Sequence, residues 1–457
     1  MGMHIHMAYS AHDAFSQQWD AASSQYQQLT YKIYKNSPSL APANCLAEKD
    51  INTFIASMVD VRNKPHAALS CMVQRHDFLF KHLDKNDIAD MAWLAYKHNA
   101  VLAADALYNA AEQSFNSYSA ARIRFHKAKY LFEREQWKDT ITTLQSFSIE
   151  STLTPQEAEY AYFMTGVALQ HLGQHRDALK VYDVIDPSSH YYPAILTNKA
   201  VANLKQGWWT DSQLNIESVI KQSTKSKQFA LVDRSHLLMG YMQIQHEFYR
   251  DARNSFRNVG LKSLYLTRAL SGMGLAAMHQ KDFVSALKIF TLLNDKTPID
   301  SYVQQTYMLI PYIHEKLGQT RLAEAKYNEA SAFYQQKIHQ IDNLLNSPLP
   351  NTEKMEPVLA ILKQSDNQKA VSTALDLLTS PISLQLKNDI NRLKTLKNIL
   401  EKNNDDTYIN ALNTQISTYS LLAQQHQKER LLSAKAAYQN YLNQCQFALA
   451  RLYDDVN

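Results

Sequence analysis

The stretch GVALQHLGQHRDALKVY, residues 166–182, places a second small residue twelve positions after the first and an aromatic residue four positions after that. These offsets recur with first positions at 128, 166, 200, 240, 274 and 311, so the steps between them are 38, 34, 40, 34 and 37 residues. Small residues let paired helices approach closely, and the aromatic side chain fills the space between adjacent pairs. The period is that of a repeated helix–turn–helix unit of about 34 residues, with short insertions. Three triplets are complete: Gly166/Ala178/Tyr182, Gly240/Ala252/Phe256 and Gly274/Ala286/Phe290. Two are weaker, Ala128/Thr140/Leu144 and Ala200/Ser212/Ile216. The last, Pro311/Ala323/Tyr327, keeps only its second half.

Turn and cap residues between these positions support the same interpretation. Thr154-Pro155-Gln156-Glu157 combines a capping threonine, a proline suited to the first turn and a glutamate that can reach back, which predicts a helix start. Gly173, Gly207 and Gly318 lie where the two helices of a unit would be joined, and a left-handed backbone is needed there. We therefore assign about six divergent repeats to residues 120–346.

The chain outside the repeats divides into three further regions. Residues 1–7, MGMHIHM, read as vector-derived, so a signal peptide could have been removed with the natural start. Residues 8–119 hold helices that cap or extend the array, without an assigned repeat register. Residues 347–457 lack the repeat signature and predict helices over 352–378, 381–402 and 406–453.

The C-terminal region is predicted to form an antiparallel helical hairpin or a three-helix bundle. One apolar stripe runs from Leu386 to Leu400, and a heptad-like pattern with one skip runs from Ile409 to Leu452. Packing the two helices together would bury both stripes. The coiled-coil-like last helix is also a candidate surface for oligomerisation.

Composition and motifs argue against catalysis and against nucleic acid as a partner. The 457 residues are 45% hydrophobic and 20% charged with only 9 Gly, which is too apolar for disorder and too poor in glycine for an α/β enzyme with phosphate loops. A net charge of +4 is mild for a nucleic-acid-binding protein. The sequence has no phosphate loop, nucleophile elbow or HExxH signature. His66, Cys71, His76 and His82 do not share a helical face, so we expect no metal site, no cofactor and no catalytic residue.

Cysteine usage and hydropathy bear on the cellular compartment. Cys45, Cys71 and Cys445 are the three cysteines, and Cys45 and Cys71 could form a disulfide in an oxidising compartment or remain buried thiols. No run of residues approaches the 18 to 20 apolar residues, roughly, of a membrane span. The modest charge, the abundant Gln, Asn and Tyr and the possible Cys45–Cys71 bridge favour the periplasm, with the cytoplasm as the alternative.

The middle half of the chain resembles the tetratricopeptide repeat family, through Gly166, Leu169, Gly173, Ala178 and Tyr182 and the same offsets from Gly240 and Gly274. The resemblance implies an all-α superhelix of helix pairs and is of the divergent kind found in bacterial envelope proteins. No repeat has the family's tryptophan four residues before the glycine position; Trp137 and Trp209 stand where the second helix begins. The asparagine and lysine arrangement that clamps a chaperone's C-terminus is also missing.

The resemblance implies that the first helices of the pairs line a concave face that binds peptides or partner helices. The implied surface mixes aromatic and basic groups, which suits an acidic or aromatic-bearing segment; packing of the same residues within the chain is the alternative. We therefore expect a non-enzymatic protein-interaction scaffold of the cell envelope, or alternatively a regulatory or sensor subunit whose groove takes a peptide or small ligand. The implied contact residues are Arg122, Phe125, Lys129, Tyr160, Phe163, His171, Arg234, Tyr241, Arg268, His279, Tyr312 and Lys316.

Overall fold

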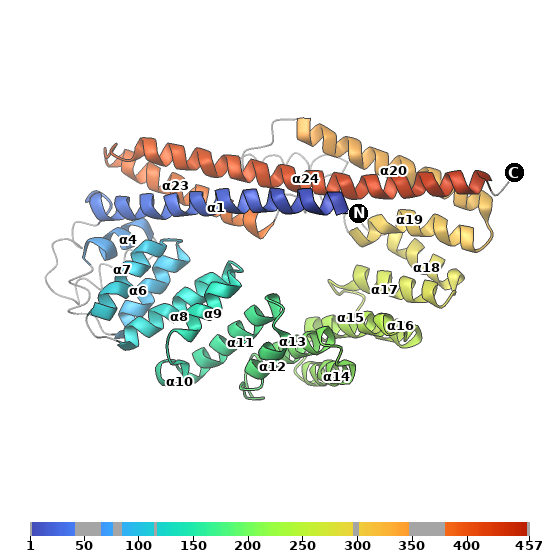
Figure 1. The fold of residues 1–457 in the computed structure, drawn as a ribbon, viewed down its shortest axis with the longest axis horizontal. Helices are drawn as coiled ribbons and strands as arrows, with labels where there is room; N and C mark the ends of the chain where they lie inside the picture. The colour runs from blue at the N-terminus through green and yellow to red at the C-terminus, as the bar shows by residue number, and fades with distance from the viewer. Residues whose placement is uncertain are drawn as a thin grey trace. The chain divides into compact units, whose positions relative to one another are not determined.

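The chain is an all-α protein of the tetratricopeptide-like solenoid class (Figure 1). The computed structural model describes residues 2–41, 65–75, 85–113, 117–295, 301–346 and 380–454, and all regular structure within them is helical. The chain divides into two compact units. The first comprises Met1–Tyr192 with Gln385–Ala423, and the second comprises Pro193–Leu384 with Gln424–Asn457. None of the described helices is long and apolar enough to cross a membrane.

The helices of the first unit come from both ends of the chain. In the first unit they are α1 (Gly2–Asn36), α4 (Pro65–Gln74), α6 (Lys85–Lys97), α7 (Val101–Gln113), α8 (Ser117–Glu133), α9 (Trp137–Gln145), α10 (Ile149–Thr152), α11 (Pro155–His171), α12 (His175–Tyr182), α23 (Pro381–Lys402) and the first part of α24 (Ile409–Asp454). The second unit holds the remainder of α24 with α13 (Tyr192–Lys205), α14 (Trp209–Lys225), α15 (Phe229–Gln245), α16 (Tyr249–Arg257), α17 (Leu266–His279), α18 (Phe283–Asn294), α19 (Ser301–Lys316) and α20 (Thr320–Asn346).

The glycines of the repeat signature are covered by the aromatic rings sixteen residues later, as predicted. A Cβ atom at Gly166 would lie 2.2 Å from the Tyr182 ring, and one at Gly240 would lie 2.6 Å from Phe256. Phe256 also covers Gly272 of the following repeat, at 2.3 Å from an added Cβ. One buried ring therefore fixes the spacing within a repeat and between two repeats.

The turns inside the helix pairs adopt the left-handed backbone that the sequence indicates. Gly173 and Gly207 have φ of 76° and Gly318 has φ of 70°. At the start of α11, the Thr154 hydroxyl accepts a hydrogen bond from the backbone N–H of Glu157. The Glu157 carboxylate accepts one from the backbone N–H of Thr154, which confirms the predicted capping box.

Several other described turns use residues with a Cβ in the same strained region. Glu135, Glu247 and Lys281 have φ of 60°, 65° and 59°. We expect Lys281→Gly to raise the free energy of unfolding by about 0.5–1 kcal/mol, because glycine adopts this conformation without the steric cost. Gly173→Ala, whose added Cβ meets no described atom within 4 Å, should lower it by about 1 kcal/mol through the backbone alone. Denaturant titration of both variants tests this, and no gain for Lys281→Gly would contradict it.

One further helix pair precedes the six that the sequence assigns. α6 and α7 are joined at Asn99, whose φ is 58°, and their residues Ala92 and Ala104 are fully buried. Ala92, Ala104 and Tyr108 keep the offsets of twelve and sixteen, and Ala92 precedes Ala128 by 36 residues. The array therefore begins before residue 120, and part of the region 8–119 belongs to it.

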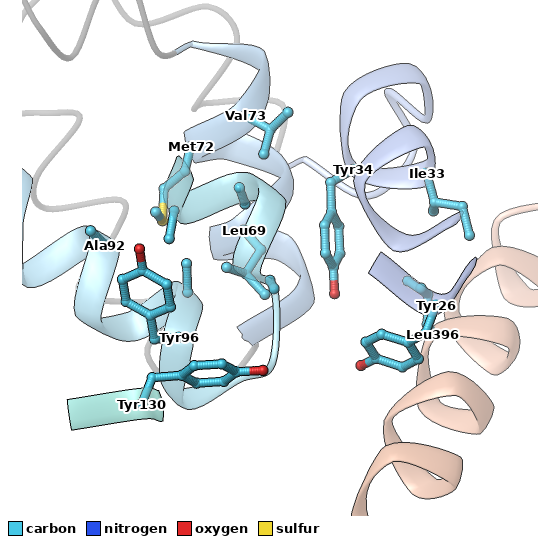
Figure 2. Packing of buried hydrophobic residues seen from close by; sticks show 14 of the residues in the cluster. Tyr26, Ile33, Tyr34, Leu69, Met72, Val73, Ala92, Tyr96, Tyr130 and Leu396 are labelled. Atoms are coloured by element: carbon cyan, nitrogen blue, oxygen red, sulfur yellow. The ribbon is translucent and has the colours of Figure 1, made fainter. Parts of the chain in front are cut away.

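The predicted C-terminal bundle is completed by the N-terminal helix. The α23 stripe at Leu386, Leu393 and Leu400 shares one core with α1 and with the first part of α24. Tyr419 of α24 stacks on Tyr26 of α1, with ring centroids 5.7 Å apart. Figure 2 shows Tyr26 and Ile33 of α1 facing Leu396 of α23. The amphipathic stripes were identified correctly, but α1 is a partner that the sequence did not indicate; the predicted helix 352–378 lies outside the described residues.

Asn99 connects these helices through a buried polar network. It is 2% exposed, and its Oδ1 accepts hydrogen bonds from Tyr130 Oη at 2.7 Å and from Gln27 Nε2 at 3.1 Å. Arg134 donates to the same oxygen at 3.4 Å. Burial raises the pKa of Asp389, which also hydrogen-bonds Asn99. The network ties α1, α8 and α23 to the turn between α6 and α7.

In the second unit the remainder of α24 packs on α20. Tyr334 stacks on Tyr441 with centroids 5.3 Å apart, and Lys435 pairs with Asp342 at 2.6 Å. Cys445 is a buried free thiol within this core. Cys71 of α4 is buried and disulfide-bonded, and Cys45, the other half of the predicted bridge, lies outside the described residues.

Candidate partner-binding face

A row of partly exposed aromatic rings surrounds one lysine in the first unit. We call Trp93, Lys129, Phe132, Tyr160, Phe163 and Tyr191 the Lys129 face. Lys129 Nζ lies 4.2 Å from the Trp93 ring centroid and 6.0 Å from that of Tyr160. These contacts are within the range in which an ammonium is attracted to an aromatic face.

The aromatic row continues from α8 across α11 to the segment before α13. Phe163 lies 6.5 Å from Phe132, 6.2 Å from Tyr160 and 5.6 Å from Tyr191, measured between ring centroids. Each of the four rings is of intermediate exposure rather than buried. The repeat places them together because Phe132 belongs to the first helix of one pair and Tyr160 and Phe163 to the first helix of the next.

Lys129 forms no salt bridge within 4 Å among the described residues, although the charges of Glu133 and Glu157 act on it from further away. Burial lowers the pKa of Lys129, while Glu133 and Glu157 oppose that change. Glu157 is engaged elsewhere, since its two oxygens accept from Arg122 at 3.0 and 3.2 Å. Lys129 therefore presents a half-buried ammonium that aromatic rings hold in place.

His126 lies beneath this face with both ring nitrogens unpartnered among the described residues. It is 5% exposed and packs on Trp93, with centroids 5.4 Å apart. Burial lowers its pKa to about 3, and Lys129 and Arg122 add to the shift while Glu157 opposes it. A neutral imidazole therefore lies near both Arg122 and Lys129 of α8.

The buried histidines predict loss of stability in mild acid. Burial also lowers the pKa of His66 and of His98 to about 4. Because each folded pKa lies below the usual 6.5, the stabilisation is complete above pH 6.5, roughly, and is lost as the pH falls towards the folded values. Between pH 7.5 and pH 5, the unfolding free energy of the wild type should fall by on the order of 2 kcal/mol more than that of His126→Phe. Equal losses for wild type and variant in denaturant titrations would contradict this.

In the structure the other predicted contact residues of the first unit are engaged by contacts within the chain. Phe125 is 2% exposed and belongs to the core with Leu144 and Met164, so it offers no surface to a partner. His171 is exposed, but it stacks on Trp137 with ring centroids 4.1 Å apart. Arg122 is neutralised by Glu157, as described above. Of the first-unit residues, Lys129, Tyr160 and Phe163 are brought together on a partly open face.

The predicted residues of the second unit form separate groups. Tyr241 donates a hydrogen bond from its hydroxyl to the carbonyl of Arg268 at 3.0 Å, and both Arg234 and Arg268 are exposed. His279 stacks on Tyr249 at 4.8 Å. Tyr312 and Lys316 contact each other, with Nζ 5.2 Å from the ring, and Tyr312 also lines a cavity of about 540 Å³ between α19 and α24.

Trp93 and Tyr191 are the members of the Lys129 face that sequence reasoning missed, since Phe132 is also an inner position implied by the family resemblance. Trp93 belongs to α6, whose repeat register was not assigned, although Ala92 beside it begins the offset pattern. Tyr191 lies between α12 and α13, outside the regular helix positions, and no periodic signal indicates it. Among the described residues no group of three His, Cys, Asp or Glu side chains could hold a metal ion.

No protein-family model and no curated protein matches the sequence significantly. Distant likenesses of fold exist among solved structures. The apo form of RapI is 12% identical, with a TM-score of 0.42 over 73% of this chain and 97% of that chain. The apo form of the quorum sensor NprR from B. thuringiensis is 12% identical, with a TM-score of 0.38 over 73% and 98% of the two chains. A Rap protein complexed with competence and sporulation factor is 12% identical, with a TM-score of 0.34 over 74% and 100%.

Proposed function

We propose that the chain is a non-enzymatic protein-interaction scaffold that binds an acidic, aromatic-bearing peptide segment on the Lys129 face. The observation that carries the proposal is the ammonium of Lys129, which is half-buried among Trp93, Phe125 and Tyr160 and forms no direct salt bridge with a described carboxylate. A partner's carboxylate would supply a direct counter-ion.

The aromatic row supplies the second part of recognition. A charge-assisted hydrogen bond to a half-buried ammonium is stronger than one in open water, and apolar side chains gain from burial against partly exposed rings. Phe163 and Tyr191, with their rings 5.6 Å apart, offer such a surface beside the ammonium. An acidic residue followed by an aromatic one in the bound segment would use both features.

Selection from a library of random peptides tests the proposal. Peptides enriched on the full chain are expected to carry acidic and aromatic residues and to bind with micromolar Kd. Lys129→Met, which keeps most of the apolar stem, should weaken binding by about tenfold, equivalent to about 1.4 kcal/mol. Lys138→Met, at an exposed position of α9, changes the net charge equally and should leave the Kd unchanged. Equal affinities for the two variants would contradict the proposal.

We also propose a bacterial envelope location, on the periplasmic side. The disulfide at Cys71 supports it, since disulfides persist in oxidising compartments. Cell fractionation with a periplasmic marker tests it, and recovery with the cytoplasmic marker would contradict it. Oligomerisation through the C-terminal helices stays a prediction; Leu421, Leu432 and Phe447 of α24 are 65%, 45% and 72% exposed.

A further inference from the structure

A second, chemically different cavity lies in the other unit, between α14, α15 and α16. It has a volume of about 580 Å³. Its walls include the rings of Trp209 and Phe248 and the carboxylates of Glu217 and Asp251. We call it the Trp209 pocket. It shares no residue with the Lys129 face, so a ligand in this pocket would bind independently of the proposed function.

The aromatic wall of the pocket consists of rings that pack on one another and are partly open to solvent. The Trp209 and Phe248 ring centroids are 5.6 Å apart, and His246 packs on Trp209 at 4.2 Å. Phe248 is 49% exposed, which is high for a phenylalanine that has a neighbouring ring to pack on. A flat ligand group could lie against these rings without displacing any core side chain.

The charge of the lining is opposite to that of the whole chain. The chain carries 47 basic and 43 acidic residues, yet the described residues that line the pocket include two carboxylates and no lysine or arginine. The lining histidine, His236, has its pKa lowered by burial and so adds no positive charge near neutral pH. The pocket is therefore suited to a cation.

The two carboxylates of the pocket are its charged hydrogen-bond acceptors. One oxygen of Glu217 accepts from Gln213 Nε2 at 2.8 Å, which orients the carboxylate. Gln243 uses its Oε1 to accept from Ser255 at 2.7 Å. Asp251 accepts no hydrogen bond from a described side chain and is exposed. Carboxylates that face an aromatic wall match a guanidinium, which stacks on rings and donates from a planar fork.

A structural role at the start of a helix does not by itself explain why Asp251 lines the pocket. Aspartate recurs as the third residue of the second helices, at Asp139, Asp177, Asp211 and Asp251, where it favours the positive end of the helix. Asp251, unlike Asp211 at the same position of α14, lines a cavity beside exposed aromatic rings. This difference provides the matched control for a test.

We propose that the Trp209 pocket binds an arginine side chain of a partner polypeptide. The guanidinium stacks on Trp209 and Phe248 and donates to Asp251 and Glu217. The pocket therefore recognises a basic residue, whereas the Lys129 face recognises an acidic one.

Titration with Nα-acetyl-arginine amide tests this, with the neutral Nα-acetyl-citrulline amide as the matched compound. The indole N–H signal of Trp209 in an ¹H–¹⁵N spectrum, assigned with Trp209→Phe, should shift saturably with the arginine compound only. Glu217→Gln/Asp251→Asn should raise the Kd by at least roughly tenfold, as expected for the loss of a charge-assisted pair. Asp211→Asn should leave it unchanged.

Several outcomes would overturn the proposal. Equal shifts with citrulline would show that charge is not recognised, and an unchanged Kd for the Glu217→Gln/Asp251→Asn variant would show that these carboxylates are not the acceptors. Equal affinity for Nα-acetyl-lysine amide would exclude a guanidinium-specific site. Circular dichroism melting curves identify any variant that is misfolded. If the double variant is misfolded, the single substitution Asp251→Asn replaces it and is expected to raise the Kd at least threefold.

Discussion

Replacing Phe256 by alanine is expected to lower the free energy of unfolding by about 3–5 kcal/mol, the range found for phenylalanine truncations in well-packed cores. Phe256 is 2% exposed, and its ring covers Gly240 of its own repeat and Gly272 of the next. Because no side chain on either glycine can fill the space, the cavity would remain open. Denaturant titration followed by helical circular dichroism measures the change.

The control for this prediction is a second phenylalanine in the same unit. Phe229 at the start of α15 is 64% exposed, and Phe229→Ala should change the unfolding free energy by less than about 0.5 kcal/mol. Gly272→Val should also destabilise, since its added Cβ would lie 2.3 Å from the Phe256 ring. In the Phe256→Ala background, Gly272→Val should lower the unfolding free energy by less than it does in the wild type. Additive effects would show that ring and glycine are not coupled.

Asn99→Ala is expected to cost about 3–4 kcal/mol in the first unit. The substitution removes the Asn99 side chain to which buried Tyr130, Gln27 and Asp389 hydrogen-bond, and it leaves the Tyr130 hydroxyl without that acceptor. It also forces alanine to adopt a φ of 58°. Asn99→Gly relieves the backbone cost but still removes the bonds, so it should recover only about 1 kcal/mol.

Asn404 provides a matched control for the backbone part of this effect. It has a φ of 55° but is exposed, in the turn between α23 and α24. Asn404→Ala should therefore lower the unfolding free energy by only about 1 kcal/mol. Similar losses for Asn99→Ala and Asn404→Ala would contradict the assignment of a buried network at Asn99.

The repeat core could be predicted from the sequence because close packing constrains residue size at fixed offsets. Gly166 and Tyr182, or Gly240 and Phe256, form a contact that few other residue pairs could make. The same offsets at Ala92 were available but are weaker, because alanine is common in helices. The pairing of α1 with α23 could not be predicted, since an apolar stripe indicates that a helix face is buried but not by which partner.

The candidate site was predictable in part. Lys129, Tyr160 and Phe163, which the family resemblance implied, lie close to one another. His171 and His279 lie at the ends of first helices as expected, but they stack on Trp137 and Tyr249, a contact between pairs that no single repeat reveals. Packing of the chain on itself thus accounts for some of the predicted contact residues and leaves the Lys129 face open.

Site-specific photo-crosslinking tests the central claim most directly. A benzophenone amino acid replaces Tyr191 at the edge of the Lys129 face or, as a control, Tyr453, which is 53% exposed in α24. The account predicts that a library-selected acidic peptide crosslinks at position 191 and not at position 453, and that Lys129→Met suppresses the product. A bound peptide that crosslinks equally at both positions, or at 191 regardless of Lys129, would contradict it.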